Sequence, residues 1–333
     1  MSMKHHLAIG LGLLALLAIV PVFVQSRYLL GEMILFFIWV GVVTQWNLVL
    51  GVAGIFSLAQ MMVFAVGGYV AAMLAVHLGW SIWPALLLGA FAAVLVSTII
   101  GLATLRLRGA YVALLTLALA SAMQSLIVVD TNCFSFEGGT CLTLTGGASG
   151  LSRFADFGFR ELLGYQYAAV GDYYLGLLLM LLGSVFAFLL INSPLGHAFH
   201  ALRDNPTCAA ARGIDRAKYQ VLVFSLSAFF TGLFGGFYAG HFKAIGPTIL
   251  DIPTLLFLMS AMIVGGVGRF WGPILGCAAL MLFDVLVKDY AEWRMVGIGV
   301  LTIVSVIVFP NGIVGLIEGS WLKISLGSQR PAI

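Results

Sequence analysis

Long apolar runs separated by short polar intervals dominate the chain, and this pattern predicts a bundle of membrane helices. A helix that crosses a membrane needs about 20 predominantly apolar residues. The runs that approach this length are 7–25, 29–49, 55–77, 82–104, 110–129, 172–192, 217–240, 252–268, 270–287 and 294–310. The predicted fold class is therefore an all-α polytopic membrane protein, with about ten transmembrane helices in one transmembrane domain over residues 1–333.

The first apolar run could belong to a signal peptide or to a membrane helix. Lys4 precedes the run, as a basic residue precedes the apolar core of a signal peptide. However, no small-x-small cleavage pattern stands before Arg27, and further apolar runs follow. We interpret residues 1–24 as the first transmembrane helix.

The most polar interval in the second half, residues 193–216, lies between two long apolar runs. Its apolar residues recur at helical spacing with polar residues between them, namely Leu195, Ala198, Phe199 and Leu202 against His197, His200, Arg203 and Asp204. This pattern predicts an amphipathic helix along a membrane surface. Two histidines at i, i+3 can bind a metal ion. A solvated helix face explains them more simply, so no metal site is expected.

A second short helix is predicted directly after the first. Asn205 is a good N-cap, Pro206 suits the first helical turn, and Gly213 suits the C-terminal cap. Two capped helices between membrane spans would offer a rigid surface to a soluble partner. The alternative is an ordinary connecting loop.

Two glycine-interrupted stretches, 47–60 and 264–276, stand out within the apolar runs. The first contains Gly51 and Gly54 together with the polar residues Asn47, Ser57 and Gln60, and the second contains Gly265, Gly266 and Gly268. Broken helices at membrane depth occur where the backbone lines a cavity or is covered by protein, and in transporters they form substrate sites. These residues are therefore candidates for a translocation path. A plain turn at the membrane face is the alternative for the first stretch.

Small residues in the third apolar run have a structural interpretation. Gly67, Gly68, Ala71 and Ala72 allow close contact between helices.

Composition excludes a soluble protein. The chain is 62% hydrophobic and 9% charged, with mean hydropathy +1.10, whereas soluble domains carry about 25% charged residues. The net charge of +3 is small, and nothing in it predicts a nucleic-acid partner.

The distribution of basic residues predicts the orientation in the membrane. With ten spans, one side receives Lys4, Arg106, Arg108, Arg203, Arg212, Arg216, Lys218, Lys323 and Arg330. By the positive-inside rule this side is the cytoplasm. Both termini and the 193–216 segment are then cytoplasmic, while residues 130–171 form an external loop. In that loop Cys133 and Cys141 could form a disulfide in an oxidising compartment, or remain two free thiols.

The ionisable residues and nucleotide-binding motifs of the sequence leave several classes of function open. No ionisable side chain lies clearly in the middle of a predicted span, although ion-coupled carriers usually have one. No Lys-Ser/Thr phosphate loop follows the Gly265–Gly268 run, so the chain cannot supply an ATPase itself. A secondary carrier or channel would share the same hydropathy. A membrane enzyme would need paired carboxylates or a histidine cluster at one face.

Several motifs together resemble the permease subunits of branched-chain amino-acid ABC transporters. The residues that match the family's cytoplasmic loop are Leu195, Gly196, Ala201, Arg203, Asn205, Ala209, Ala210, Gly213 and Ile214. The stretch NLVLGVAGIFSLAQ, the external run TGGASGL, and the late runs VGGVGRFWGPILG and FPNGIVGL match further family patterns. The chain departs from the family at Ala59 and Gln60, where Gly-His is common, and at Thr207, where ABC importers often have Glu.

The resemblance implies a function and a set of partners. It implies an importer subunit of the bacterial inner membrane that moves leucine, isoleucine or valine by alternating access, while urea, short amides and other amino or aromatic acids are alternative cargoes. It also implies a second permease subunit, cytoplasmic ABC ATPases that bind the ATP, a periplasmic binding protein and surrounding lipid. The chain itself is then not an enzyme and holds no cofactor, and segment 193–216 is the coupling segment that contacts the ATPase.

Overall fold

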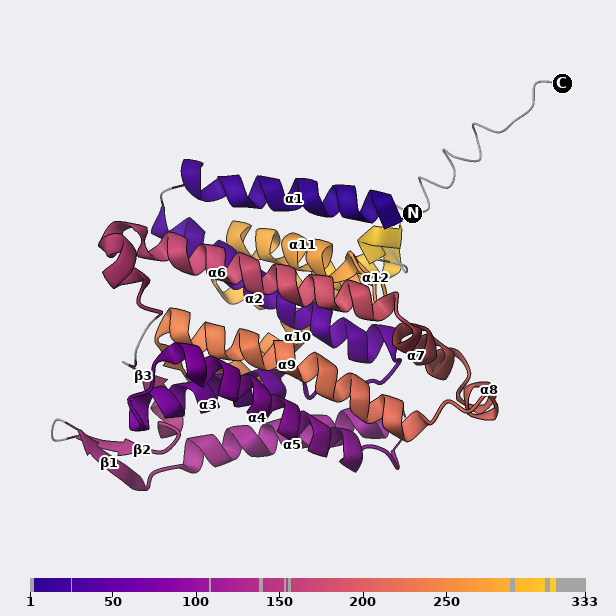
Figure 1. The fold of residues 1–333 in the computed structure, drawn as a ribbon, viewed down its shortest axis with the longest axis horizontal. Helices are drawn as coiled ribbons and strands as arrows, with labels where there is room; N and C mark the ends of the chain where they lie inside the picture. Colours follow the sequence, from indigo (N-terminus) through magenta and orange to yellow (C-terminus); the bar gives the residue numbers. More distant parts are fainter. Residues whose placement is uncertain are drawn as a thin grey trace.

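Helices that lie side by side form most of the structure (Figure 1). The computed structural model describes residues 3–24, 26–107, 109–137, 140–152, 154, 157–287, 291–308 and 312–315. The α-helices are α1 (Met3–Phe23), α2 (Arg27–Asn47), α3 (Gln60–His77), α4 (Ile82–Ala103), α5 (Ala110–Val129), α6 (Phe159–Ile191), α7 (Pro194–Asp204), α8 (Pro206–Ala211), α9 (Arg216–Phe242), α10 (Ile252–Gly265), α11 (Gly272–Leu286) and α12 (Ala291–Val308).

Within the described residues, six helical stretches are long and apolar enough to cross a membrane. They are Arg27–Val52, Gln60–His77, Ile82–Ala103, Ala110–Val129, Tyr167–Ile191 and Arg216–Phe242. Each of the ten predicted apolar runs contains a helix, but α10 and α11 have only 14 and 15 residues. The α-helical polytopic class is confirmed, while the number of ten spans stays a prediction.

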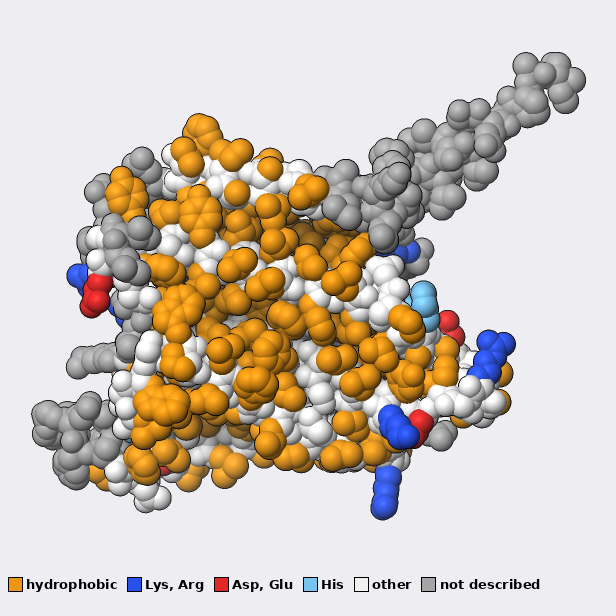
Figure 2. All heavy atoms as spheres, in the orientation of Figure 1, with side chains coloured by type: hydrophobic (Ala, Val, Ile, Leu, Met, Phe, Trp, Pro, Cys, Tyr) orange, Lys and Arg blue, Asp and Glu red, His pale blue; other side chains and the backbone are white. Residues whose placement is uncertain are grey.

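The outer surface of the bundle is apolar between two polar ends. Figure 2 shows hydrophobic side chains over the middle of the molecule and charged side chains toward both ends. On α4 the exposed residues Leu87, Phe91, Leu95 and Ile99 recur every four positions, so they form one stripe along the helix. Such a stripe is stable against lipid but not against water.

The centre of the fold is the close packing of α3, α4 and α9. Glycines make this packing possible: a Cβ on Gly67 would lie 2.4 Å from the carbonyl oxygen of Gly232, and a Cβ on Gly89 would lie 2.3 Å from that of Gly67. The predicted contact role of the small residues near Gly67 is confirmed, because side chains at these points would force the backbones apart.

Short strands gather at the end of the bundle opposite α7 and α8 (Figure 1). Strand β1 (Cys133–Glu137) pairs antiparallel with β2 (Thr140–Thr143), and β3 (Leu151–Ser152) pairs with β4 (Ala244–Ile245). The 3-10 turns η2 (Gly147–Ser149) and η3 (Pro247–Leu250) lie beside them. Hydropathy did not reveal these strands, because they belong to the segments that connect the spans, β1 to β3 between α5 and α6 and β4 between α9 and α10.

The predicted external loop 130–171 is shorter than expected, since α6 already begins at Phe159. The first turns of α6 precede the predicted apolar run 172–192. Gly164, which has φ +78°, forms a kink that separates these turns from the rest of the helix. Cys133 is disulfide-bonded, and Cys208 and Cys277 are free. The side chain of Cys141 lies outside the described residues, so its pairing with Cys133 stays a prediction.

Candidate functional site

Helix α7 is anchored to the bundle at its first half. The hydroxyl of Ser193 accepts a hydrogen bond from the N–H of Gly196 (3.3 Å), which caps the helix. Phe199 is 1% exposed and packs on Tyr219 of α9, with ring centroids 5.9 Å apart. Gly196 lies so close to the end of α6 that a Cβ would be 2.2 Å from the carbonyl oxygen of Ile191. The predicted amphipathic helix is confirmed, with its apolar side against the bundle.

Helix α8 projects from the end of the molecule (Figure 1). The Asn205 side chain accepts from the N–H of Cys208 (3.1 Å), and Gly213 ends the turn with φ +83°. Ala209 is buried, whereas Cys208 and Ala210 are exposed. The predicted second helix is confirmed with the predicted cap. Of the other residues that match the family's cytoplasmic loop, Leu195 and Ala201 are half-buried on α7, Arg203 lies near the end of that helix, and Ile214 follows α8.

The first glycine-interrupted stretch is a break in the helical backbone. After α2 the chain continues as a π-helix, η1 (Leu48–Val52), and then runs without regular structure until α3 begins. π-Helical turns inside helices are frequent at functional sites. Asn47, Ser57 and Gln60 are all buried here, and Gln60 donates from its side-chain amide to the hydroxyl of Thr231 on α9. The predicted interruption of the helical backbone is present and its polar groups are buried. Its place in a translocation path stays a prediction, as does the alternative of a turn at the membrane face.

The two glycine-interrupted stretches meet at this break. The Asn47 side chain donates to the carbonyl oxygen of Arg269 (3.0 Å) and accepts from the N–H of Gly268 (2.7 Å). A Cβ on Gly51 would lie 2.4 Å from the nitrogen of Gly268. The structure therefore brings Asn47, Gly51 and Gly268 together although more than two hundred residues separate them in the sequence.

Gly265 and Gly266 have a packing role instead. A Cβ on Gly265 would lie 1.8 Å from the carbonyl oxygen of Gly272, where α10 meets α11, and Gly266 adopts φ +117° directly after α10. A Cβ on Gly312 would lie 2.4 Å from the Cα of Gly266. These glycines hold three backbone segments in close contact.

Arg203 joins helix α7 to the break. Its guanidinium donates to the carbonyl oxygen of Gly51, and its Nε lies 3.6 Å from the carboxylate of Asp204. A Cβ on Gly54 would lie 2.4 Å from Cγ of Arg203, so Gly54 leaves room for the side chain. The sequence predicted the helix and the break separately, but their contact follows only from the structure.

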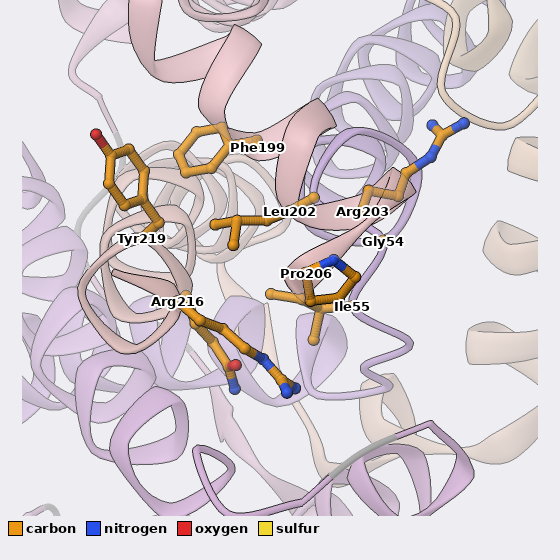
Figure 3. A pocket seen from close by; sticks show the side chains of 10 residues that line it. Gly54, Ile55, Phe199, Leu202, Arg203, Pro206, Arg216 and Tyr219 are labelled. Atoms are coloured by element: carbon orange, nitrogen blue, oxygen red, sulfur yellow. The ribbon is translucent and has the colours of Figure 1, made fainter. Parts of the chain in front are cut away.

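A cavity of about 230 Å³ lies beneath α7, between this helix, α9 and residues 53–55 (Figure 3). Leu202, Ile55 and Arg216 lie around the space, and the Arg203 guanidinium extends away from it. Gln220 lines the cavity and donates to the hydroxyl of Thr104 (3.1 Å). Sequence reasoning missed Gln220, although an amide near the start of an apolar run was the available signal.

The electrostatics of α7 affect one histidine. Burial lowers the pKa of His200, and the positive charge of Arg203 lowers it further, while Asp204 acts in the opposite direction. His200 is therefore held toward its neutral form on the inner side of α7.

Comparison with known proteins relates the chain to transport proteins. The family described as "Branched-chain amino acid transport system / permease component" matches residues 28–308. Two relatives, from Salmonella typhimurium and Escherichia coli, are each named high-affinity branched-chain amino acid transport system permease protein LivM. Each is 25% identical over 305 residues, covering 85% of this chain and 69% of its own length. No solved structure matches the chain.

Proposed function

Because the chain belongs to the branched-chain amino acid transport system permease family, we propose that it is the membrane-spanning subunit of an ABC importer for leucine, isoleucine and valine. It is a multi-pass protein of the inner membrane. The relatives' names, which specify branched-chain amino acids, support this cargo. The chain has no Lys-Ser/Thr phosphate loop, so partner ATPases bind and hydrolyse the ATP, and this subunit carries no cofactor of its own.

Segment 193–216 is the proposed contact with these ATPases. Helix α8 is exposed at the end of the bundle, and α7 connects it to the core through Phe199. A rigid, capped projection of this kind transmits a push without deforming. The cavity beneath α7 supports a movable element, since close-packed interiors leave no room for displacement.

The single observation that carries the proposal is the bond between Arg203 and Gly51. Movement of α7 would pull directly on the π-helical break after α2. Through Asn47 the same break holds the turn between α10 and α11. Closure of the ATPases would in this way rearrange both glycine-interrupted stretches, including Ser57 and Gln60 of the proposed path. The path would then open alternately to the two sides of the membrane.

The proposed arrangement in the membrane has about ten spans and cytoplasmic termini. The end with α7 and α8 faces the cytoplasm, and the end with the short strands faces the periplasm. A homologous second permease subunit completes the translocation path, and a periplasmic binding protein delivers substrate to the external segment 130–171.

The test begins with purification of the full chain from its native membrane in mild detergent. We expect a soluble ATPase and a second permease to co-purify. Gly213→Pro should abolish recovery of the ATPase but not of the second permease, because proline fixes φ near −65° where Gly213 has +83°. Reconstituted with these partners, the wild-type chain should import leucine only with ATP. Leucine transport by the chain alone would contradict the proposal and assign a secondary carrier or channel.

A further inference from the structure

One face of α9 meets α6 through a row of rings. The rings recur along α9 at helical spacing and therefore lie on one face of the helix, at Phe230, Phe234, Phe237 and His241. Helices α6 and α9 run in opposite directions (Figure 1). The rings accordingly meet α6 in the reverse order of its sequence, at Phe186, Gly183, Gly176 and Asp172. We call this contact the α6–α9 seam.

A layer of side chains, and not contact between backbones, fills the seam. The ring centroids of Phe230 and Phe186 are 4.7 Å apart. Glycine makes room on α6 for the next ring, since a Cβ on Gly183 would lie 3.3 Å from the ring of Phe234. Because ring side chains can turn about their χ bonds, this contact can open without deforming either helix.

The opposite face of α9 is held by its backbone. A Cβ on Gly235 would lie 2.9 Å from the nitrogen of Gly68 on α3, and a Cβ on Gly232 would lie 2.9 Å from the Cα of Ala90 on α4. Close backbone contacts of this kind leave little room for displacement. Helices α3, α4 and α9 therefore form one unit, and the seam is the side on which this unit can separate from α6.

A buried amide beside the seam has an acceptor without a partner. The Gln45 side chain on α2 is 0% exposed, and its Nε2 donates to the carbonyl oxygen of Gly183 (3.0 Å). This bond fixes the amide group, and within the described residues Oε1 of Gln45 has no hydrogen-bond partner. A buried acceptor without a partner is costly, and native proteins usually supply one.

Two hydroxyl groups at the crossing of α2 and α6 share this property. Oγ of Ser184 and Oγ1 of Thr44 are buried and have no hydrogen-bond partner in the described structure. They neighbour Gly183 and Gln45 in the chain. Amide and hydroxyl oxygens accept hydrogen bonds, and an ammonium group carries three donors and no acceptor. These unpartnered atoms therefore fit a ligand with an ammonium group.

We infer that the transported amino acid passes along the α6–α9 seam and that Oε1 of Gln45 accepts a hydrogen bond from its ammonium group. The break after α2 begins two residues beyond Gln45, at Asn47, and continues the route toward the cytoplasm. At the outer end Nδ1 of His241 lies 2.8 Å from Oδ2 of Asp172, and this pair must separate before the substrate enters. The inference rests on the proposed function for the substrate and for the orientation.

The first test measures whether water reaches the seam during transport. In a protein that also carries Cys208→Ala, Ser184→Cys should react with a hydrophilic methanethiosulfonate about tenfold faster during ATP-driven uptake than Ser97→Cys, because local opening exposes only the seam. Ser97 is the matched control, since it is 1% exposed and its hydroxyl donates to the carbonyl oxygen of Phe224 where α4 meets α9. Equal rates would overturn the inference.

The second test removes the acceptor with little change in volume. With saturating leucine-loaded binding protein, Gln45→Met should lower the rate of uptake about tenfold, the loss expected for one hydrogen bond to a charged group. The thermal unfolding midpoint shows whether the variant is folded. If Oε1 instead binds only a buried water molecule, the apolar replacement leaves uptake unchanged, and this result would refute the role of Gln45.

The seam and the proposed function can fail separately. Normal ATP-driven uptake with equal labelling of Ser184→Cys and Ser97→Cys would refute the seam alone. Absence of ATP-driven uptake by the wild-type assembly would refute the importer. The seam would still be supported if leucine slowed the labelling of Ser184→Cys in the purified chain and 4-methylpentanoate, which lacks the ammonium group, did not. Equal protection by both compounds would overturn the ammonium contact.

Discussion

At the scale of single residues, Arg203 connects a surface helix with the interior. Its guanidinium bonds the Gly51 carbonyl, and its aliphatic part lies against Gly54. We expect Arg203→Glu to reduce leucine uptake at least tenfold while ATP hydrolysis continues, because a hydrogen bond from a charged group contributes about 1.5–3 kcal/mol. The measurement is the ratio of leucine imported to ATP hydrolysed in proteoliposomes.

The control for this prediction is another charge reversal on the same side. Lys218→Glu changes an exposed residue whose ammonium group forms an ion pair with Asp215, three residues earlier on the same helix end. It should leave the ratio within about twofold of the wild type, since exposed ion pairs contribute about 0–1 kcal/mol. An equal loss in both variants would show that net charge, rather than the Arg203 contact, matters.

Gly51 allows a second test at the scale of single residues, because its backbone lies very close to the backbone of Gly268. Gly51→Ala would put a Cβ 2.4 Å from the nitrogen of Gly268 and should disturb its bond with Asn47. We expect a loss of about 1–3 kcal/mol, as for overpacking elsewhere. Gly31→Ala on the same span meets no atom within 4 Å and should be neutral or slightly stabilising. Thermal unfolding of both variants in detergent measures the difference.

At the scale of elements, α7 should respond to pH through His200. Burial and Arg203 lower its pKa in the folded state below the usual 6.5, so protonation opposes folding. Above pH 6.5 His200 is neutral in both states and does not reduce the free energy of unfolding. This free energy decreases as the pH falls from 6.5 through the lower pKa that His200 has in the folded state. His200→Gln cannot take up the proton. Unfolding midpoints between pH 8 and 5.5 should therefore fall more for the wild type than for this variant, and parallel curves would contradict the prediction.

Local signals explain which elements could be predicted from the sequence. Asn205, Pro206 and Gly213 mark α8 because capping depends on neighbouring residues only. The break after α2 was marked in the same way by Gly51 and Gly54. The contact of Asn47 with Gly268 and Arg269 was not predictable, because pairing of distant segments depends on tertiary packing that no local pattern contains.

At the scale of the whole molecule, the apolar belt and the two polar ends define a membrane orientation that can be measured. The end with α7 and α8 carries the exposed thiol of Cys208, whereas Cys277 is buried. At the other end Ser149 is exposed in the turn η2. The proposed topology, which follows the positive-inside rule, places the segment with Arg203, Arg212, Arg216 and Lys218 in the cytoplasm. The two positions should therefore lie on opposite sides of the membrane.

The expected labelling pattern follows from this geometry. In a protein that also carries Cys208→Ala, a membrane-impermeant maleimide added to spheroplasts should label Ser149→Cys, and Cys208→Ala alone is the unlabelled control. In the wild type, Cys208 should react only after the membrane is permeabilised. Labelling of Cys208 from outside would invert the proposed topology. Binding of the partner ATPase should then slow the reaction of Cys208 in permeabilised membranes, because α8 would be covered, and should leave the rate at Ser149→Cys unchanged. Slower labelling at the external position alone would contradict the assignment of segment 193–216 as the coupling surface.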